Sequence, residues 1–277
     1  RRSSDLKISY EERGTMTNIN KGSQYIDSRN LNVRIKLHEM FSTNKQGFHE
    51  WIFSQLNLKE NIKVLEIGCG PGALWYKNFN EIPKFIDITL VDLSAGMLED
   101  AKKNIEEVTS SKNFKFVNAN IEKLPFKNKE FDIVIANHML YHVPDISAGL
   151  AEVKRVLKDN GVFYSSTFSK DHLHEINCIT RKFVDIKKNR TSDRFCIENA
   201  EEQLNKHFSS IKLFMHQDSL IITESQPLID YIMSGSKAKE TLVGDKYKEF
   251  SKYINECVFE TGVFNVQKKA GVFISKK

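Results

Sequence analysis

In the middle of the chain, short apolar runs alternate with longer segments in which apolar residues recur every three or four positions. Apolar, β-branched runs predict strands, and the wider spacing predicts amphipathic helices. The predicted strands are residues 62–67, 88–93, FKFVNA (114–119), FDIVIAN (131–137) and GVFYSSTF (161–168). The predicted helices are residues 71–80, 94–108 and DISAGLAEVKRVL (145–157), with Ser94 as a cap and Asn160-Gly161 as a stop signal. This alternation predicts a mainly parallel sheet with helices on both faces.

The segments on either side have a less regular pattern. Before the alternation, residues 26–41 and 48–56 predict two amphipathic helices. After it, helices are predicted at 170–184, 198–207 and 225–258, and strands at IKLFMHQ (211–217), SLIITE (219–224) and GVFISKK (271–277). We divide the chain into a tail (1–15) and one domain (16–277), which consists of a helical cap (16–58), a core (59–168) and C-terminal additions (169–277). Segments outside such a core commonly form the substrate pocket.

Composition describes an ordinary globular protein and narrows the choice of partners. The 277 residues are 40% hydrophobic and 28% charged, with a formal net charge of +5. Lysines are interspersed with glutamates, which favours a solvated surface over a nucleic-acid patch. Cys69, Cys178, Cys196 and Cys257 show no CxxC spacing, so neither a zinc site nor a disulfide framework is indicated. Because no signal-peptide pattern and no membrane-spanning apolar run is found, we expect a cytoplasmic protein without a membrane partner.

The sequence VLEIGCGPGALW, residues 64–75, is a predicted strand followed by a glycine-rich turn. Gly68, Gly70 and Ala73 match the GxGxxG/A pattern of dinucleotide-binding folds. Asp92 follows at the distance expected of a ribose-binding acid. A dehydrogenase that binds NAD is therefore one interpretation of the turn.

Three residues of the same stretch oppose that interpretation. Pro71 and Gly72 change the turn to GxGxG, and Glu66 occupies a strand position that dinucleotide folds normally keep apolar. A buried carboxylate is costly unless it is paired or hydrogen-bonded. We therefore expect a cationic or donor-rich partner for Glu66.

Three successive segments resemble the motifs of class I S-adenosylmethionine-dependent methyltransferases. They are VLEIGCGPG (64–72), LVDLSAGML (90–98) and NIEKLPFKNKEFDIVIANHMLYHVPD (120–145). Their order, spacing and strand-helix context agree over residues 60–168. The flanks QYIDSRNLNVRIKLHEMFSTN (24–44) and SSTFSKDHLHEI (165–176) are similar to a bacterial branch of small-molecule-type enzymes in that superfamily.

The resemblance implies a fold and a reaction. The fold is Rossmann-like α/β, with a mainly parallel sheet, an antiparallel C-terminal strand, helices on both faces, an N-terminal helical cap and a C-terminal insertion. The reaction moves a methyl group from S-adenosylmethionine to a small organic acceptor and leaves S-adenosylhomocysteine. The acceptor and the oligomeric state are not implied.

The resemblance also implies a cofactor site. Glycines let the backbone approach the methionine end of the cofactor, Glu66 helps to hold that end directly or through water, and Asp92 accepts both ribose hydroxyls. Met97 packs on the adenine, and Asn120 stands where the family often has an adenine-binding Asp. The residues predicted to bind the cofactor are Glu66, Gly68, Cys69, Gly70, Gly72, Asp92, Leu93, Met97, Asn120, Ile121, Asn137, Arg34 and Tyr25.

Four of the remaining residues in this list have the following expected roles. Ile121 would offer its backbone N–H to the adenine, and Asn137 its carbonyl to the methionine amino group. Tyr25 and Arg34, with His38, lie on a helix that family members often fold across the cofactor. Arg34 would pair with the cofactor carboxylate, because a guanidinium binds carboxylates bidentately; a surface arginine is the alternative.

The catalytic candidates lie in NHMLYHVPD, residues 137–145. His138 and His142 follow the fourth strand, where family substrates approach the methyl group, and imidazole suits a general base near neutral pH. A structural role is the alternative for each. Their spacing of four would place both on one face of a helix, but no further ligand lies nearby, so we predict no metal. Tyr141 is expected to orient the substrate or cover the pocket.

Aromatic and histidine residues in the flanks bear on the acceptor. Phe41, Phe48, Trp51 and Trp75 are expected mainly in the core, although an aromatic lid would favour a hydrophobic or planar acceptor. His172 and His174 are candidates for the far side of the acceptor pocket. Enzymes that methylate amino groups of nucleic-acid bases have an NPPY-type tetrapeptide at the end of the fourth strand. ANHM stands there in this sequence, which disfavours a nucleic-acid base as the methyl acceptor. An RNA or protein methyltransferase and a non-catalytic cofactor-binding module remain alternatives.

Overall fold

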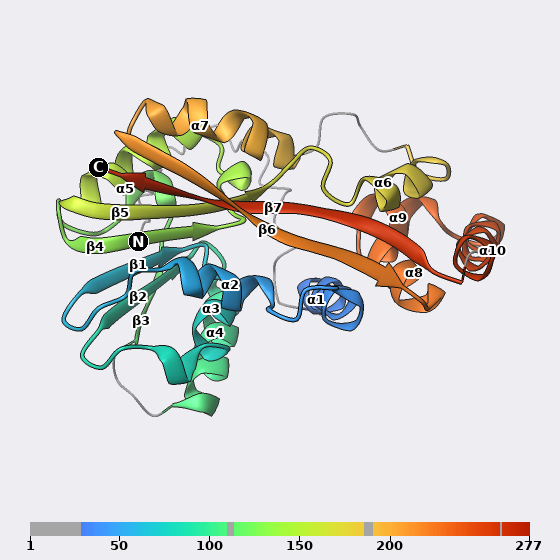
Figure 1. Cartoon of the computed structure of the whole chain (residues 1–277), viewed down its shortest axis with the longest axis horizontal. Coiled ribbons are helices and arrows are strands. Elements are labelled where there is room, and N and C mark those ends of the chain that lie inside the picture. The colour runs from blue at the N-terminus through green and yellow to red at the C-terminus, as the bar shows by residue number, and fades with distance from the viewer. Residues whose placement is uncertain (1–28, 110–113, 186–190, 261) are drawn as a thin grey trace, which may run out of the picture.

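The computed structural model describes residues 29–109, 114–185, 191–260 and 262–277. Within these ranges the chain forms a sheet of seven strands in the order β3-β2-β1-β4-β5-β7-β6 (Figure 1). Five strands are parallel, namely β1 (Lys63–Ile67), β2 (Asp87–Asp92), β3 (Phe114–Asn118), β4 (Phe131–Asn137) and β5 (Leu157–Phe168). β7 (Phe264–Lys276) runs antiparallel to β5 and to β6 (Ser210–Ile222). The predicted fold class is confirmed.

Helices cover both faces of the five parallel strands, which explains why β1, β2 and β4 are mostly apolar and buried along their length. On one face lie α2 (Phe48–Gln55), α3 (Ala73–Tyr76) and α4 (Ala95–Val108), and on the other lie α5 (Ile146–Val156) and α7 (Ile197–Asn205) (Figure 1). Alternate residues of each strand enter the two cores. In β4, Ile133 and Ile135 pack towards α2, α3 and α4, whereas Val134 and Ala136 pack towards α5 and α7.

The two last strands extend beyond the parallel sheet and carry a second group of helices. We call this the distal helical group; it consists of α1 (Arg29–Phe41), α6 (His174–Arg181), α8 (Ser225–Met233), α9 (Ser236–Thr241) and α10 (Asp245–Phe259) (Figure 1). A separate apolar core lies within it, to which Leu37 of α1 and Phe250 of α10 contribute. No helix among the described residues is long and apolar enough to span a bilayer. The predicted boundaries of the cap, core and additions stay a prediction.

One predicted helix is shorter than expected, and one predicted strand is longer. Residues 71–80 form only α3 and the 3₁₀ turn η2 (Phe79–Glu81). The helix that precedes β5 ends at Val156, so Asn160-Gly161 lies inside the strand and does not end the helix. A Cβ at Gly161 would lie 2.6 Å from the Leu157 side chain, so glycine is required here by close packing within an irregular strand.

The predicted C-terminal strands are also longer than expected. IKLFMHQ and SLIITE form one strand, β6, and GVFISKK is only the end of β7. Asp218 lies between the two predicted strands. In the structure it is part of β6, directly opposite Lys268 of β7, and forms an ion pair with it. A polar residue in a strand is stabilised when the cross-strand neighbour carries the opposite charge.

Candidate active site

The glycine-rich turn after β1 has left-handed backbone conformations. The φ angles of Gly68, Gly70 and Gly72 are 67°, 53° and 79°, a region that residues with a Cβ rarely adopt. A Cβ at Gly68 would lie 2.8 Å from Met139, and one at Gly72 would lie 3.3 Å from Ala101 of α4. Among the described residues, no atom would lie within 4 Å of a Cβ at Gly70. Packing therefore accounts for Gly68 and Gly72, whereas the backbone of Gly70 faces open space.

Asp92, at the end of β2, holds the same turn. Its Oδ2 accepts from the Gly70 N–H at 2.9 Å, and its Oδ1 accepts from the Ser94 N–H at 2.9 Å. Ser94 caps α4, as predicted, by accepting from the N–H of Met97. Burial raises the pKa of Asp92, and the two N–H donors partly oppose that rise. Each carboxylate oxygen keeps a further lone pair, so Asp92 can accept additional hydrogen bonds from a ligand.

The two apolar residues predicted near the adenine differ in exposure. Leu93 exposes 73% of its surface beside Asp92, whereas Met97 exposes 3%. A large, exposed apolar side chain next to a carboxylate is a surface that the flat face of a ligand ring can cover. Leu93 offers such a surface, while Met97 is already covered by protein.

Glu66 has two neutral N–H donors as its partners. The Trp75 Nε1–H donates to Oε2 at 2.7 Å, and the Asn137 Nδ2–H donates to Oε1 at 3.3 Å. The side chain is 3% exposed, and burial raises its pKa to about 8 although both hydrogen bonds act to lower it. Of the predicted alternatives, the donor-rich partner is the one found. Glu66 joins β1, α3 and β4 beneath the glycine turn, and its raised pKa keeps it mostly protonated at neutral pH.

Glu66→Gln is expected to change how stability depends on pH. Since the pKa of Glu66 is about 8 when folded and 4.5 when unfolded, the folded state holds an extra proton between these values. Stability from this group is therefore present below pH 4.5 and is lost as the pH rises to 8. Glutamine cannot ionise, so the free energy of unfolding of the variant relative to the wild type should rise by a few kcal/mol from pH 5 to pH 8. Urea unfolding at both pH values measures this; equal pH slopes would contradict it.

Two of the predicted adenine contacts are engaged with the protein itself. The Asn120 Oδ1 accepts from the Glu122 N–H at 3.0 Å, which caps the 3₁₀ turn η3 (Ile121–Lys123), and its Nδ2–H donates to the Glu122 carboxylate. Ile121 packs in the core beneath α5 and is almost fully buried. Their roles towards a cofactor stay predictions.

His138, directly after β4, has an unusual conformation and environment. Its φ is +50°, and its ring stacks on Phe168 of β5 at 3.9 Å between centroids and 8° between planes. No described residue forms a hydrogen bond with Nδ1, which is buried. Burial, with smaller contributions from the neighbouring His49, His38 and Lys268, lowers the pKa of His138 to about 3. An imidazole with so low a pKa is a weak proton acceptor.

Tyr141 and His142 lie in the 3₁₀ turn η4 (Leu140–His142), which follows His138. Tyr141 is buried in the core beneath α5, and its ring contacts that of His142, which is exposed. The left-handed turn at His138 separates the two histidines, so the prediction that they share one helical face is wrong. Among the described residues, no group of three or more His, Cys, Asp or Glu is arranged to hold a metal ion.

A column of four rings leads from the end of the parallel sheet towards the distal helical group. Phe48 of α2 lies 4.6 Å from His138, His138 stacks on Phe168, and Phe168 lies 4.2 Å from His172. His174 was predicted to line the acceptor pocket together with His172. It lies on the exposed surface of α6, where its Nε2 is 3.2 Å from the Cys178 Sγ. The sequence motifs do not reveal this column, because its rings come from three segments that are far apart in the chain.

The other residues of the N-terminal flank are placed as follows. Arg34 donates from Nε to the Ser234 Oγ at the end of α8 at 2.9 Å, so α1 packs against α8 within the distal helical group. Tyr25 lies outside the described residues. Trp75 is fully buried and serves as a partner of Glu66, whereas Trp51 lies 5.0 Å from the ring of His216 in β6.

A buried ion pair that the sequence analysis did not single out lies between the two long strands and the loop after α1. The Lys268 ammonium donates to Asp218 and, at 2.8 Å, to the Ser42 Oγ. Asp218 also accepts from the Ser42 hydroxyl at 2.7 Å and from the Asn44 N–H at 3.1 Å. These bonds attach residues 42–44 to β6 and β7. Only the pairing of the two strands brings Asp218 and Lys268 together, so local pattern offers no signal for them.

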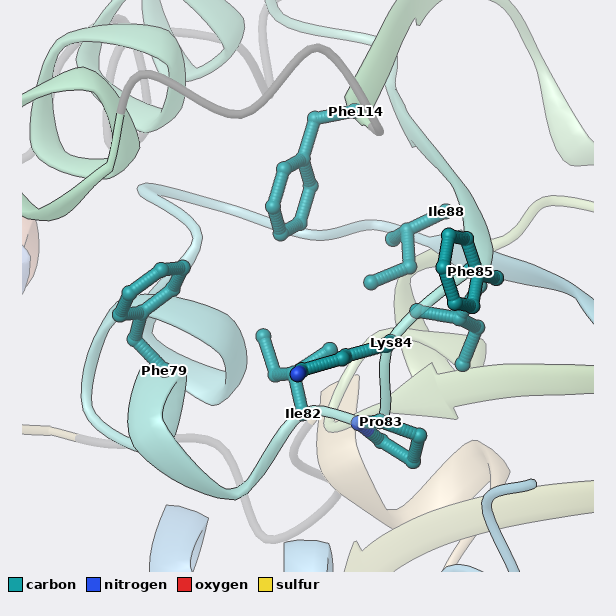
Figure 2. Close-up of a pocket in the computed structure, with 8 residues that line it drawn as sticks. Phe79, Ile82, Pro83, Lys84, Phe85, Ile88 and Phe114 are labelled. Carbon is teal, nitrogen blue, oxygen red and sulfur yellow. The ribbon is translucent and has the colours of Figure 1, made fainter. Parts of the chain in front are cut away.

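A recess elsewhere on the surface is lined mainly by apolar side chains, and it lies at the opposite end of the strands (Figure 2). Phe85, Ile88 and Phe114 belong to the start of β2 and β3 and to the turn before β2. The glycine turn, Asp92 and His138 lie at the carboxyl ends instead. In open sheets of this kind ligands bind at the carboxyl ends, so this recess is not part of the candidate site.

Comparison with known proteins decides between the two interpretations of the turn. A family model described as a methyltransferase domain matches residues 58–212, which is more than half of the chain. The chain belongs to the class I S-adenosylmethionine-dependent methyltransferases. The match covers the glycine turn, Asp92 and His138, and the antiparallel β7 likewise departs from the all-parallel order of dinucleotide-binding folds.

Individual relatives of this methyltransferase agree with the family model. Over 167 residues it is 32% identical to the ubiquinone/menaquinone biosynthesis C-methyltransferase UbiE of Rickettsia prowazekii. The matched region covers 59% of this chain and 65% of that protein. It is 35% identical over 118 residues to the sterol 24-C-methyltransferase erg6 of Aspergillus fumigatus, covering 42% and 30%. The methyltransferase thus matches less than two thirds of the length of either relative.

Solved structures share the fold of this methyltransferase at low sequence identity. The YcgJ protein from Bacillus subtilis superposes with a TM-score of 0.56 and 18% identity, and the match covers 83% of this chain and 97% of that one. At this identity the likeness concerns the fold alone.

Proposed function

We propose that this methyltransferase transfers the methyl group of S-adenosylmethionine to a small organic acceptor at the carboxyl ends of β1, β2 and β4. The open space at Gly70, bordered by the Asp92 carboxylate, is the observation that carries the proposal. UbiE and erg6, by their names, act in quinone biosynthesis and on a sterol, which supports a small-molecule acceptor here as well.

The residues present fit the cofactor. Asp92 is oriented by two backbone N–H groups and retains lone pairs for the two ribose hydroxyls, and Leu93 beside it has exposed apolar surface for the adenine. Glu66 is a buried acid with neutral partners; an ammonium group close to it would lower its pKa and favour its ionised form. The assignments of Cys69, Asn120, Ile121, Asn137, Arg34 and Tyr25 to the cofactor remain part of this proposal.

The chain's own contribution to the reaction is mainly positioning. When bound, the cofactor supplies a methyl group on a positively charged sulfur, which is already electrophilic. The rings of Phe48, His138 and Phe168 pack against one another at the carboxyl end of β4, where they would orient the acceptor and keep out water. Because the pKa of His138 is about 3, His138 acts here as a hydrogen-bonding group rather than as a strong base. His142 and Tyr141 remain candidates for contact with the acceptor.

Calorimetry with S-adenosylhomocysteine and with NADH tests the proposal. We expect S-adenosylhomocysteine to bind and NADH not to bind; the reverse result would contradict the function and leave the fold unaffected. Gly70→Ala should weaken S-adenosylhomocysteine binding about tenfold or more, because the new methyl group occupies the open space beside the turn. Gly244→Ala is the matched control. Gly244 also has a positive φ, 59°, and open space around it, but it lies before α10 in the distal helical group.

A further inference from the structure

Besides His49, three histidine rings near the end of the sheet have nitrogens without hydrogen-bond partners among the described residues. In the described part of the chain, neither ring nitrogen of His38 or of His138 has a partner, and the Nδ1 of each is buried. His172 differs, because its Nδ1 accepts from the Lys269 N–H at 3.0 Å. Its proton must then reside on Nε2, for which no described residue provides an acceptor. Buried polar atoms without partners are rare in folded proteins and call for an explanation.

These rings belong to one cluster. His138 and His172 stack on opposite sides of Phe168 at 3.9 and 4.2 Å. Hydrogen bonds tie His38 and Lys268 to the same place. Lys268 donates to the Ser42 Oγ at 2.8 Å, and the Ser42 N–H donates to the His38 carbonyl at 3.0 Å. Lys269, the next residue after Lys268, donates its N–H to the His172 Nδ1. Burial lowers the pKa of all three histidines, and the charge of Lys268 contributes to each lowering. His38, His138 and His172 are each only partly buried as residues, so they are not sealed in the core. They lie between the carboxyl end of β4 and the distal helical group.

The cluster offers more hydrogen-bond donors than acceptors. Neutral His38 and His138 each have one N–H and one lone pair, whereas His172 presents only its Nε2–H. Lys268 uses two N–H groups on Asp218 and Ser42, and a third has no acceptor among the described residues. A partner rich in oxygen lone pairs satisfies this arrangement, and a cationic partner does not. Asp218, the carboxylate beside Lys268, is already bound by Lys268, Ser42 and Asn44.

We infer that His38, His138, His172 and Lys268 form the recognition site for an anionic oxygen, a carboxylate or phenolate, on the methyl acceptor. This inference rests on the proposed function and specifies its substrate class as small organic acids. A bound anion stabilises protonated imidazole. The second ring nitrogen of His38 and of His138, which carries a lone pair in the neutral ring, then becomes a further N–H donor. His38 and His172 act in recognition and not in the chemical step.

Binding of small aromatic probes tests the inference, with S-adenosylhomocysteine binding measured on the same samples. Benzoate is compared with benzamide, which has the same shape but no charge, and 4-nitrophenolate is compared with 4-nitroaniline. We expect each anion to bind about tenfold or more tightly than its neutral counterpart, as charge-assisted hydrogen bonds imply. If benzoate binds more tightly than 4-nitrophenolate, the acceptor carries a carboxylate; if 4-nitrophenolate binds more tightly, the acceptor carries a phenolate. Imidazole ¹⁵N shifts should show new protonation of His38 or His138 when the anion binds.

Variants locate the effect. His38→Gln and His172→Gln should each reduce the preference for the anion to about threefold or less. His207→Gln is the control, because His207 lies beside Ser147 at the end of α7, away from the cluster, and the preference should be unchanged. Equal binding of charged and neutral probes, no binding of either anion to protein that binds S-adenosylhomocysteine, or equal loss in the control would overturn the inference. Failure to bind S-adenosylhomocysteine would instead count against the proposed function. The wild-type comparison stands even if a variant does not fold.

Discussion

Replacing Asp92 by alanine is expected to weaken S-adenosylhomocysteine binding about 100-fold or more. Two charge-assisted hydrogen bonds to the ribose hydroxyls would be lost, and each such bond contributes about 1.5–3 kcal/mol. The substitution also leaves the N–H groups of Gly70 and Ser94 without their acceptor, which loosens the glycine turn. Both losses act on the cofactor site, so the effect should be among the largest of any single substitution in the chain. Calorimetry measures it.

Two further substitutions separate binding from folding. Asp87→Ala changes an exposed residue at the start of the same strand and should leave both affinity and melting temperature unchanged. Asp92→Asn keeps the size of the side chain but retains only one oxygen, so its affinity should lie between those of the wild type and the alanine variant. If Asp92→Ala melts normally and binds the ligand with unchanged affinity, the ribose assignment is wrong.

Lowering the pH from 7 to 5 is expected to destabilise the protein by several kcal/mol. Burial lowers the pKa of His38 to about 3, of His49 to about 4 and of His138 to about 3, from 6.5 in the unfolded chain. The unfolded state therefore takes up protons that the folded state does not, and stability is lost as the pH falls below 6.5. Each of these histidines contributes about 2 kcal/mol to the loss between pH 7 and pH 5.

Other groups modify this loss in known directions. The pKa of His172 is also lowered well below its usual value by burial, so His172 adds to the loss. Glu66 acts in the opposite direction, because its pKa is about 8 in the folded state and it binds a proton there more readily than in the unfolded chain; it offsets about the share of one histidine. Urea unfolding at pH 7, 6 and 5 gives the slope directly. His138→Gln should flatten it, and His207→Gln should change it less, because His207 lies at the surface beside Ser147. A free energy of unfolding that is constant from pH 7 to pH 5 would show that these rings are not buried as neutral groups.

The central fold could be predicted because its signals are local. Each parallel strand is a short apolar run, and α4 and α5 show helical spacing with a cap at Ser94 and at Asp145. Such features depend only on residues that are close in the sequence, so they can be recognised without knowledge of the tertiary structure. The two long strands were predicted only in pieces, because Asp218 interrupts the apolar pattern and its partner Lys268 is 50 residues away.

The sequence by itself determined the order of strands and helices, the glycine turn and the placing of Asp92 and His138 at strand ends. Only the tertiary structure decided that Glu66 is held by Trp75 and Asn137, and that His38, His138, His172 and Lys268 form one cluster. The reason is physical. Chain periodicity reports whether a residue is buried, but the partner of a buried polar group is whichever distant segment packs against it, and that depends on the whole fold.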